Sequence, residues 1–204
     1  MKKSSFRHSA WRVNGFLPFT AEQFFAVFAA YNQAIWPAPL VAYALGIGAT
    51  ALTFARSTTA EGAVLAVLAA MWAWTGVAYH IGYFAAINPA AFAFGVLFVV
   101  EAAALLFAGA ARRSLFAGAP LADAALGLGL CAYALALYPL IGWWMGHVYP
   151  AAPVFGVSPC PVTIFTFGML LLLGGRAPWS VVVPYLRLVE ASDTAPVDVR
   201  SRRK

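Results

Sequence analysis

The chain has 204 residues, of which 63% are apolar or aromatic and only 10% are charged, against roughly a quarter in ordinary soluble domains. So few polar residues cannot cover the surface of a soluble domain, which excludes a soluble enzyme, a disordered chain and a nucleic-acid-binding module. The formal net charge of +6 comes from basic residues at the two ends and in short gaps, as in topology signals and anionic-lipid contacts. We therefore expect an integral membrane protein whose partner is the lipid bilayer and not a nucleic acid.

Long charge-free segments indicate where helices cross the membrane. Residues 23–55, 62–100 and 124–175 contain no Asp, Glu, Lys or Arg. A helix needs about 20 apolar residues to cross the hydrocarbon, and lipid offers the backbone no hydrogen-bond partners. The predicted fold class is therefore all-α, a polytopic transmembrane helix bundle of about five spans. The spans are expected near residues 37–55, 62–86, 90–111, 121–147 and 161–175.

The segment before the first span is predicted to be an amphipathic helix on the membrane surface. Thr20 and Gln23 fit the capping box that starts a helix. Over residues 20–35 bulky apolar residues recur at helical spacing, yet the segment is short for a span and carries Glu22 and several amides, as interfacial helices do. The chain is thus expected to divide into a disordered extension (1–16), a membrane domain (17–189) and a disordered basic tail (190–204).

The arginines predict which loops share a face of the membrane. With five spans, the loops after the first, third and fifth lie on one side, which is cytoplasmic by the positive-inside rule. These loops carry Arg56, Arg112, Arg113 and Arg176. This orientation places the basic N-terminus outside, a conflict that a sixth span over residues 20–36 or a start near Leu17 would remove. The amphipathic helix, the Asn88–Pro89 turn and the 148–160 loop are expected on the other face.

Glu101 lies near the middle of the third expected span. A carboxylate there is costly, so we expect it to be neutral or paired. Thr75 or Trp74 of the second span should lie at similar depth. So should the carbonyl of Leu135, because Pro139 cannot donate the helix bond to it. Two interpretations stay open: a protonated Glu101 that holds helices together, or a proton or cation relay in a transporter.

His80, His147 and Cys160 are residue types that bind soft or borderline metals, and all three are expected near one face. Glu22 could add a fourth ligand, and the two histidines could instead hold a haem, so the cofactor stays open. The spacing fits no compact ligand motif, and the simpler explanation is that the histidines bond to loop carbonyls and Cys160 packs as a small apolar residue. Cys131 is expected too deep in its span to pair with Cys160.

Several motifs follow one another in a fairly specific order. They are Leu17-Pro-Phe-Thr-Ala-Glu-Gln-Phe24, Tyr31-Asn32, Trp36-Pro37, Tyr79-His80, Ile87-Asn88-Pro89, Gly146-His147-Val-Tyr149-Pro150, Phe155-Gly156 and Pro159-Cys160-Pro161-Val-Thr163-Ile-Phe165-Thr166-Phe167-Gly168. With them the chain resembles, from about Leu17 to Pro184, a family of bacterial multi-pass membrane proteins catalogued only as a domain of unknown function. The resemblance implies a protein of the bacterial inner (cytoplasmic) membrane with no assigned reaction, and some members carry a permease-like label. It also implies further hydrophobic sequence after Pro184, where this chain turns polar.

The functional prediction is a small permease-like or accessory membrane protein with a polar site on one face. The residues expected to bind substrate or relay protons are Glu101, His80, His147, Tyr149, Asn88 and Glu22. Two alternatives stay open: an intramembrane metal- or haem-binding protein that serves an oxidoreductase, and a structural subunit of a membrane complex. A homo-oligomer or a larger complex is the expected assembly. No catalytic triad can be assembled and no phosphate-binding glycine loop is present, so we do not expect an enzyme.

Overall fold

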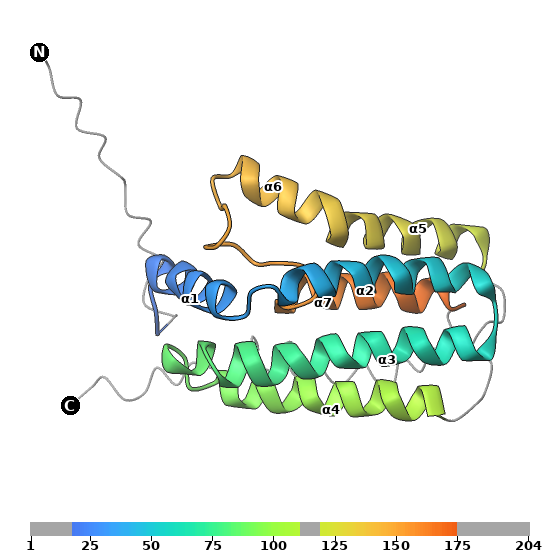
Figure 1. The fold of residues 1–204 in the computed structure, drawn as a ribbon, viewed down its shortest axis with the longest axis horizontal. Helices are drawn as coiled ribbons and strands as arrows, with labels where there is room; N and C mark the ends of the chain where they lie inside the picture. Colours follow the sequence, from blue (N-terminus) through green and yellow to red (C-terminus); the bar gives the residue numbers. More distant parts are fainter. Residues whose placement is uncertain (1–17, 111–118, 175–204) are drawn as a thin grey trace, which may run out of the picture.

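The computed structural model describes residues 18–110 and 119–174, and all of its regular elements are helices (Figure 1). Within these two ranges there is no strand, and four helices are long and apolar enough to cross a membrane. The predicted all-α class is therefore confirmed. The expected N-terminal extension and basic tail lie outside the described residues, as do three of the arginines used to assign sidedness: Arg112, Arg113 and Arg176.

The helices are interrupted by short segments of tighter or wider turns. Two of these, η2 and η4, are π-helices, and two, η1 and η3, are 3₁₀ turns. The elements in chain order are α1 (Ala21–Ala34), α2 (Ala38–Leu52), η1 (Thr53–Ala55), α3 (Thr58–Trp74), η2 (Thr75–Ile81), η3 (Phe84–Ala86), α4 (Ala91–Ala110), α5 (Leu121–Ala132), η4 (Tyr133–Leu137), α6 (Tyr138–Trp144) and α7 (Pro159–Leu172).

Helix α1 begins at the capping box that the sequence predicts. The Gln23 amide N–H donates to Thr20 Oγ1 at 3.2 Å, and the Thr20 amide donates to Gln23 Oε1 at 2.8 Å. The inner face of α1 buries Phe28, Tyr31 and Asn32, while the residues around its first turn are exposed. Helix α1 is therefore a short amphipathic element and is not among the four helices long enough to cross a membrane.

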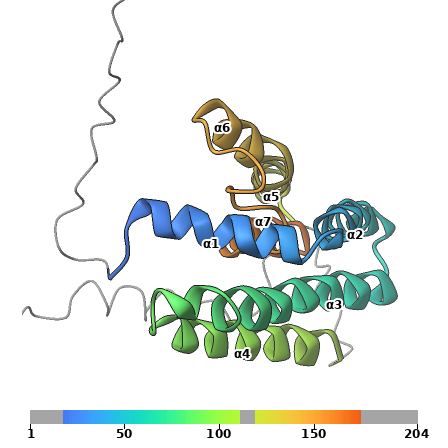
Figure 2. The same ribbon diagram turned by 60° about the vertical axis from the view of Figure 1, so that its left-hand side comes forward.

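Helices α3 and α4 form an antiparallel pair on one side of the bundle, and α5 with α6 lies on the opposite side (Figures 1 and 2). Two glycines allow the close approach of α3 and α4. A Cβ on Gly76 would lie 2.8 Å from the Gly95 carbonyl oxygen, and a Cβ on Gly95 would lie 2.9 Å from the Gly76 carbonyl oxygen. Because real Cβ atoms do not tolerate such distances, the two backbones can touch here only through glycine.

Helix α7 lies between the two sides and, after α3, contributes most to the central core. Phe165 and Met169 are fully buried among residues of α3, α4 and α5. Trp72 Nε1 of α3 donates to Thr166 Oγ1 of α7 at 2.9 Å. Helix α5 packs on α7, where a Cβ on Gly168 would lie 2.8 Å from Cys131 Sγ. The two sides of the bundle are thus joined through α7.

The two ends of the bundle differ. Helix α1, the η2–η3 segment, the start of α4 and the loop before α7 gather at one end, while η1 and the start of α3 lie at the other (Figure 1). We call the first the aromatic end. Its buried residues are Phe28, Tyr31, Ala42, Tyr79, Phe84, Ala91 and Val157. The amphipathic helix, the Asn88 turn and the 148–160 loop, which are expected on one face of the membrane, lie together at this end, with ring contacts such as Phe19–Phe84 (5.3 Å) and Phe25–His147 (4.4 Å).

Candidate functional site

A strap of polar contacts holds the 148–158 loop against α1 at the aromatic end. Asn32 Nδ2 donates to the carbonyl oxygens of Pro150 at 2.6 Å and Ala152 at 2.8 Å. The Tyr149 hydroxyl donates to the Asn32 carbonyl oxygen at 3.2 Å. Asn32 is fully buried, and a buried amide is costly unless it is hydrogen-bonded. Asn32 therefore fixes the loop in place.

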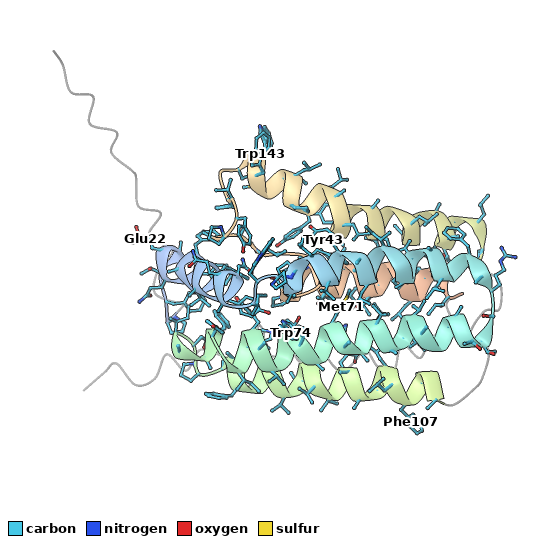
Figure 3. The ribbon with its side chains drawn as sticks, in the orientation of Figure 1. Glu22, Tyr43, Met71, Trp74, Phe107 and Trp143 are labelled. Carbon is cyan, nitrogen blue, oxygen red and sulfur yellow. The ribbon has the colours of Figure 1, made fainter. Side chains whose placement is uncertain are left out.

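Tyr31 ties three elements together at the same end. Its hydroxyl donates to the Val157 carbonyl oxygen at 2.8 Å and accepts from Trp74 Nε1 at 2.9 Å. Trp74 reaches from α3 toward the junction of α1 and α2 (Figure 3). Burial raises the pKa of Tyr31, so the hydroxyl stays protonated and serves as a donor. The Tyr31-Asn32 motif is thus the link between α1, α3 and the loop.

All of the predicted site residues except Glu101 belong to this end of the molecule. The His147 ring stacks on Phe25, and Tyr149 bonds to α1 as described above. Asn88 Oδ1 accepts from the Ala90 amide at 3.1 Å, a turn bond that precedes the first residues of α4. Glu22 is exposed in the first turn of α1 (Figure 3). For His147, Tyr149 and Asn88, these contacts give a structural role.

His80 has a different environment. It lies in the π-helix η2 and is 6% exposed. Its ring faces aromatic rings, with centroids 4.7 Å from Phe98, 6.0 Å from Phe94 and 6.2 Å from Phe84. Neither ring nitrogen has a hydrogen-bond partner. The expectation that this histidine bonds to a loop carbonyl is therefore wrong, because aromatic side chains surround it.

Glu101 is buried in α4, with 7% of its surface exposed, and its Oε1 atom has no hydrogen-bond partner. None of the predicted partners makes a hydrogen bond to Glu101 Oε1. Thr75 Oγ1 is itself buried and without a partner, and Trp74 Nε1 bonds to Tyr31. The η4 segment that holds Leu135 packs on α5, α6 and α7. The prediction of a hydrogen-bonded Glu101 is thus wrong for each of these groups.

The register of α3 against α4 explains why Thr75 and Glu101 do not meet. Gly76 lies opposite Gly95, and Gly62 lies near Gly109. The number of residues between Gly62 and Gly76 on α3 and η2 equals the number between Gly95 and Gly109 on α4. This register places Glu101 across from Ala70 and Thr75 across from Val96. The backbone level of Thr75 is therefore offset from that of Glu101 along the helix axis, and both Thr75 and His80 lie in the π-helix η2.

Thr75 and the π-helix that begins with it are the features that sequence reasoning missed. A π-turn inserts a residue into a helix and is frequent at functional sites. The available signal was a threonine within a charge-free apolar span, followed by Gly76. Thr75 itself was predicted as a partner of Glu101 from its depth in the second span, but periodicity alone could not show the π-helix or that the hydroxyl has no partner.

The proposed metal ligands are not brought together. No three His, Cys, Asp or Glu residues in the described parts of the chain are placed so that they could hold a metal ion. Cys160 is exposed at the start of α7. His147 stacks on α1 and His80 is enclosed by rings from η3 and α4.

Comparison with known families gives one match, and it covers most of the chain. The model of the family of unknown function DUF6064 matches residues 21–194. The chain belongs to this family. The predicted membership in a family of unknown function is thus confirmed, and the match spans both the aromatic end and the α3–α4 pair. No curated protein and no solved structure matches the chain significantly.

Proposed function

We propose that this member of DUF6064 is a multi-pass protein of the bacterial inner membrane with five spans and an interfacial α1. Helix α7 is the fifth span: it is apolar over 14 residues, and at about 1.5 Å per residue it covers roughly 21 Å of the hydrocarbon. Exposed aromatic side chains near the aromatic end fit the belt that anchors proteins at the lipid headgroups. They are Trp36, Trp143, Trp144 and Tyr149.

Within this arrangement the protein acts as a small permease-like transporter that carries protons. One observation carries the proposal: Glu101 is buried in a span, and its Oε1 atom has no partner. A glutamic acid that only held helices together would be expected to be fully hydrogen-bonded, because buried polar groups nearly always are. An unpaired carboxyl can bind and release a proton without breaking a structural bond, and ionisable residues inside membranes commonly mark proton pathways.

The neighbouring unpaired groups support the same function. Thr75 Oγ1 and both nitrogens of His80 are buried without partners on the helix that packs against Glu101. Polar atoms with no protein partner tend to bind water, and a line of such atoms between two helices provides sites for proton transfer. His80 lies at the aromatic end, so this line leads from the middle of α4 toward that end.

Proton flux into liposomes tests the proposal. The full chain would be reconstituted with a pH-sensitive dye inside, and acidification would be followed after a pH step with the membrane potential clamped. We expect flux above that of empty liposomes and a loss of about 100-fold in Glu101→Gln, at the low end of what positioned proton-transfer groups contribute. Asp123→Asn is the matched control, because Asp123 lies in the first turn of α5 and not between α3 and α4, and it should keep the wild-type rate.

Two results would contradict the proposal. One is wild-type flux no greater than that of empty liposomes. The other is equal flux in wild type and Glu101→Gln. Monodisperse elution of each variant in detergent would show that a loss of flux does not come from misfolding.

A second candidate, an accessory subunit of a membrane complex, is favoured by the surface of α5 and α6. Helix α5 and the η4 segment pack on α7, and the run from α5 through η4 to α6 leaves a row of large apolar side chains exposed. The row comprises Leu126, Leu137, Leu140, Ile141, Trp143 and Trp144, and Trp143 points away from the bundle in Figure 3. Crosslinking in native membranes from a cysteine at Leu140 would separate the two candidates, because a partner subunit gives a defined adduct and lipid gives none.

A further inference from the structure

Glu61 is a buried carboxyl group in the first turn of α3, where only 4% of its surface is exposed. The positive end of the helix dipole favours a charged carboxylate at this place, and a buried charge is stable only when it is paired. Of the lysines and arginines, the described residues include Arg56 alone, and it is exposed at the left-handed turn before α3. A cation from another part of the chain is therefore the better partner for Glu61.

Glu61 lies on the side of α3 that faces α7. It precedes Trp72 by eleven residues, which is close to three full turns at about 3.6 residues per turn, so the two residues share a face of the helix. Trp72 Nε1 donates from this face to Thr166 Oγ1 of α7 at 2.9 Å. The next residue, Gly62, lies about 100° further round the helix, and its Cα would be 3.8 Å from a Cβ on Gly109 of α4. A partner of Glu61 is thus expected from the α7 side and not from the α4 side.

The chain leaves α7 near the level of Glu61. Helices α3 and α7 run in opposite directions, and the start of α3 and the end of α7 lie at the same end of the bundle (Figure 1). Counting eleven residues on from Thr166, as many as separate Glu61 from its bonded tryptophan, leads to residue 177. Gly174, with a φ of +99°, turns the chain at the end of α7. The first cationic residue after this turn is Arg176.

We infer that the first turn of α3 is the docking site for the start of the C-terminal segment, and that the Arg176 guanidinium binds the Glu61 carboxylate there. The charges are complementary, and the planar guanidinium can donate two parallel hydrogen bonds to a carboxylate. Arg112 and Arg113 follow α4, which packs on the other side of α3. The family match extends to residue 194, so the docked segment belongs to the family's domain. The ion pair ties the chain beyond α7 to the end of the bundle opposite the aromatic end.

Paired substitutions in the full chain test this contact. Glu61→Gln and Arg176→Gln should each lower the midpoint of thermal unfolding in detergent by about 5 °C or more, because each leaves a buried charge without its partner. The double variant should unfold at nearly the same temperature as the less stable single variant, because both substitutions remove one interaction. Arg113→Gln is the matched control. It should leave the midpoint unchanged, and combining it with Glu61→Gln should give the sum of the two effects.

A second readout follows the C-terminal segment itself. Chymotrypsin cleaves after aromatic residues, and Trp179 lies three residues after Arg176. A docked segment is protected from cleavage until it opens locally, so we expect the cleavage after Trp179 to be about tenfold faster in Arg176→Gln than in wild type or Arg113→Gln. Mass spectrometry of the released C-terminal fragment would measure it. If Arg176→Gln fails to fold, Arg176→Lys keeps the charge but not the paired hydrogen bonds, and it should give a smaller change in the same direction.

Three results would overturn the inference. One is a wild-type midpoint and cleavage rate in Arg176→Gln. Another is a double variant in which the effects of Glu61→Gln and Arg176→Gln simply add. The third is a loss in Arg56→Gln or Arg113→Gln that does not add to that of Glu61→Gln, since it would assign Glu61 a different partner. Neither readout uses proton flux, so the inference and the proposed transport function stand or fall separately.

Discussion

The aromatic end and the α3–α4 pair use polar residues in opposite ways. At the aromatic end, Asn32, Tyr31 and Tyr149 make specific hydrogen bonds to backbone carbonyls across long stretches of sequence. Between α3 and α4, Glu101 and His80 have buried atoms with no partner. Asn32 Oδ1 is also buried without a partner, but the Asn32 Nδ2 group and the two tyrosine hydroxyls hold the first region in a fixed shape. No printed bond of Glu101 Oε1 or of the His80 ring does so in the second.

This contrast separates most motif residues from the candidate chemistry, and His80 of the Tyr79-His80 motif is the exception. The motifs that carry the family resemblance include His147, Tyr149 and Asn88, and in the structure each of them makes a contact that shapes the aromatic end. Glu101 lies outside every quoted motif. Most motif residues of this chain therefore stabilise the contacts between helices and loops, and few of them belong to the proposed proton path.

The largest effect is expected when the strap is cut. Asn32→Leu keeps the volume but leaves the Pro150 and Ala152 carbonyls without their buried donor, so the free energy of unfolding should fall by about 3 kcal/mol. Denaturation by a harsh detergent, followed by fluorescence, would measure it. Gln33→Leu is the control: Gln33 is exposed on the same helix and should change stability by less than about 0.5 kcal/mol. Equal losses in the two variants would contradict the strap.

A smaller loss is expected where α3 touches α4. In Gly76→Ala the new Cβ would lie 2.8 Å from the Gly95 carbonyl oxygen and 2.9 Å from the Phe98 Cβ atom, so the helices must separate, at a cost of about 1–3 kcal/mol. Gly48→Ala is the matched control, because no atom lies within 4 Å of the added Cβ. There alanine should be neutral or stabilising by up to about 1 kcal/mol. If Gly76→Ala is as stable as Gly48→Ala, the close approach does not exist.

Local chemistry explains which parts of the fold could be predicted from the sequence. The helices lie where the charge-free segments place them: α2 with η1 covers Ala38–Ala55 and α4 covers Ala91–Ala110, close to the expected 37–55 and 90–111. Such segments end at prolines and arginines, whose effect on a helix is local. The capping box of α1 was predictable for the same reason, since Thr20 and Gln23 are three residues apart.

The partners of Glu101 could not be predicted, because they depend on helix register. Counting from the Asn88–Pro89 turn places Thr75 at the depth of Glu101, but the connection also includes η3 and the residues around it. The midpoint between the paired residues therefore lies near Ala85, so Thr75 is nearer than Glu101 to the aromatic end. The hydrogen bonds of Asn32 to the loop could not be predicted for a related reason. They join residues 118 and 120 positions apart, and the spacing of residues within one helix gives no information about such distant pairs.

The smallest effect on stability, with a large one on transport, is expected at His80. His80→Phe replaces a ring whose two buried nitrogens have no partner with an apolar ring of similar shape among Phe84, Phe94 and Phe98. Removing buried groups that make no hydrogen bond is neutral or stabilising, so the free energy of unfolding should stay the same or rise. Proton flux should nevertheless fall, because two of the unpaired polar atoms of the proposed proton path are gone. A stability loss comparable to that of Asn32→Leu would place His80 with the strap residues, and unchanged flux would remove it from the path; either result would break the division between the two regions.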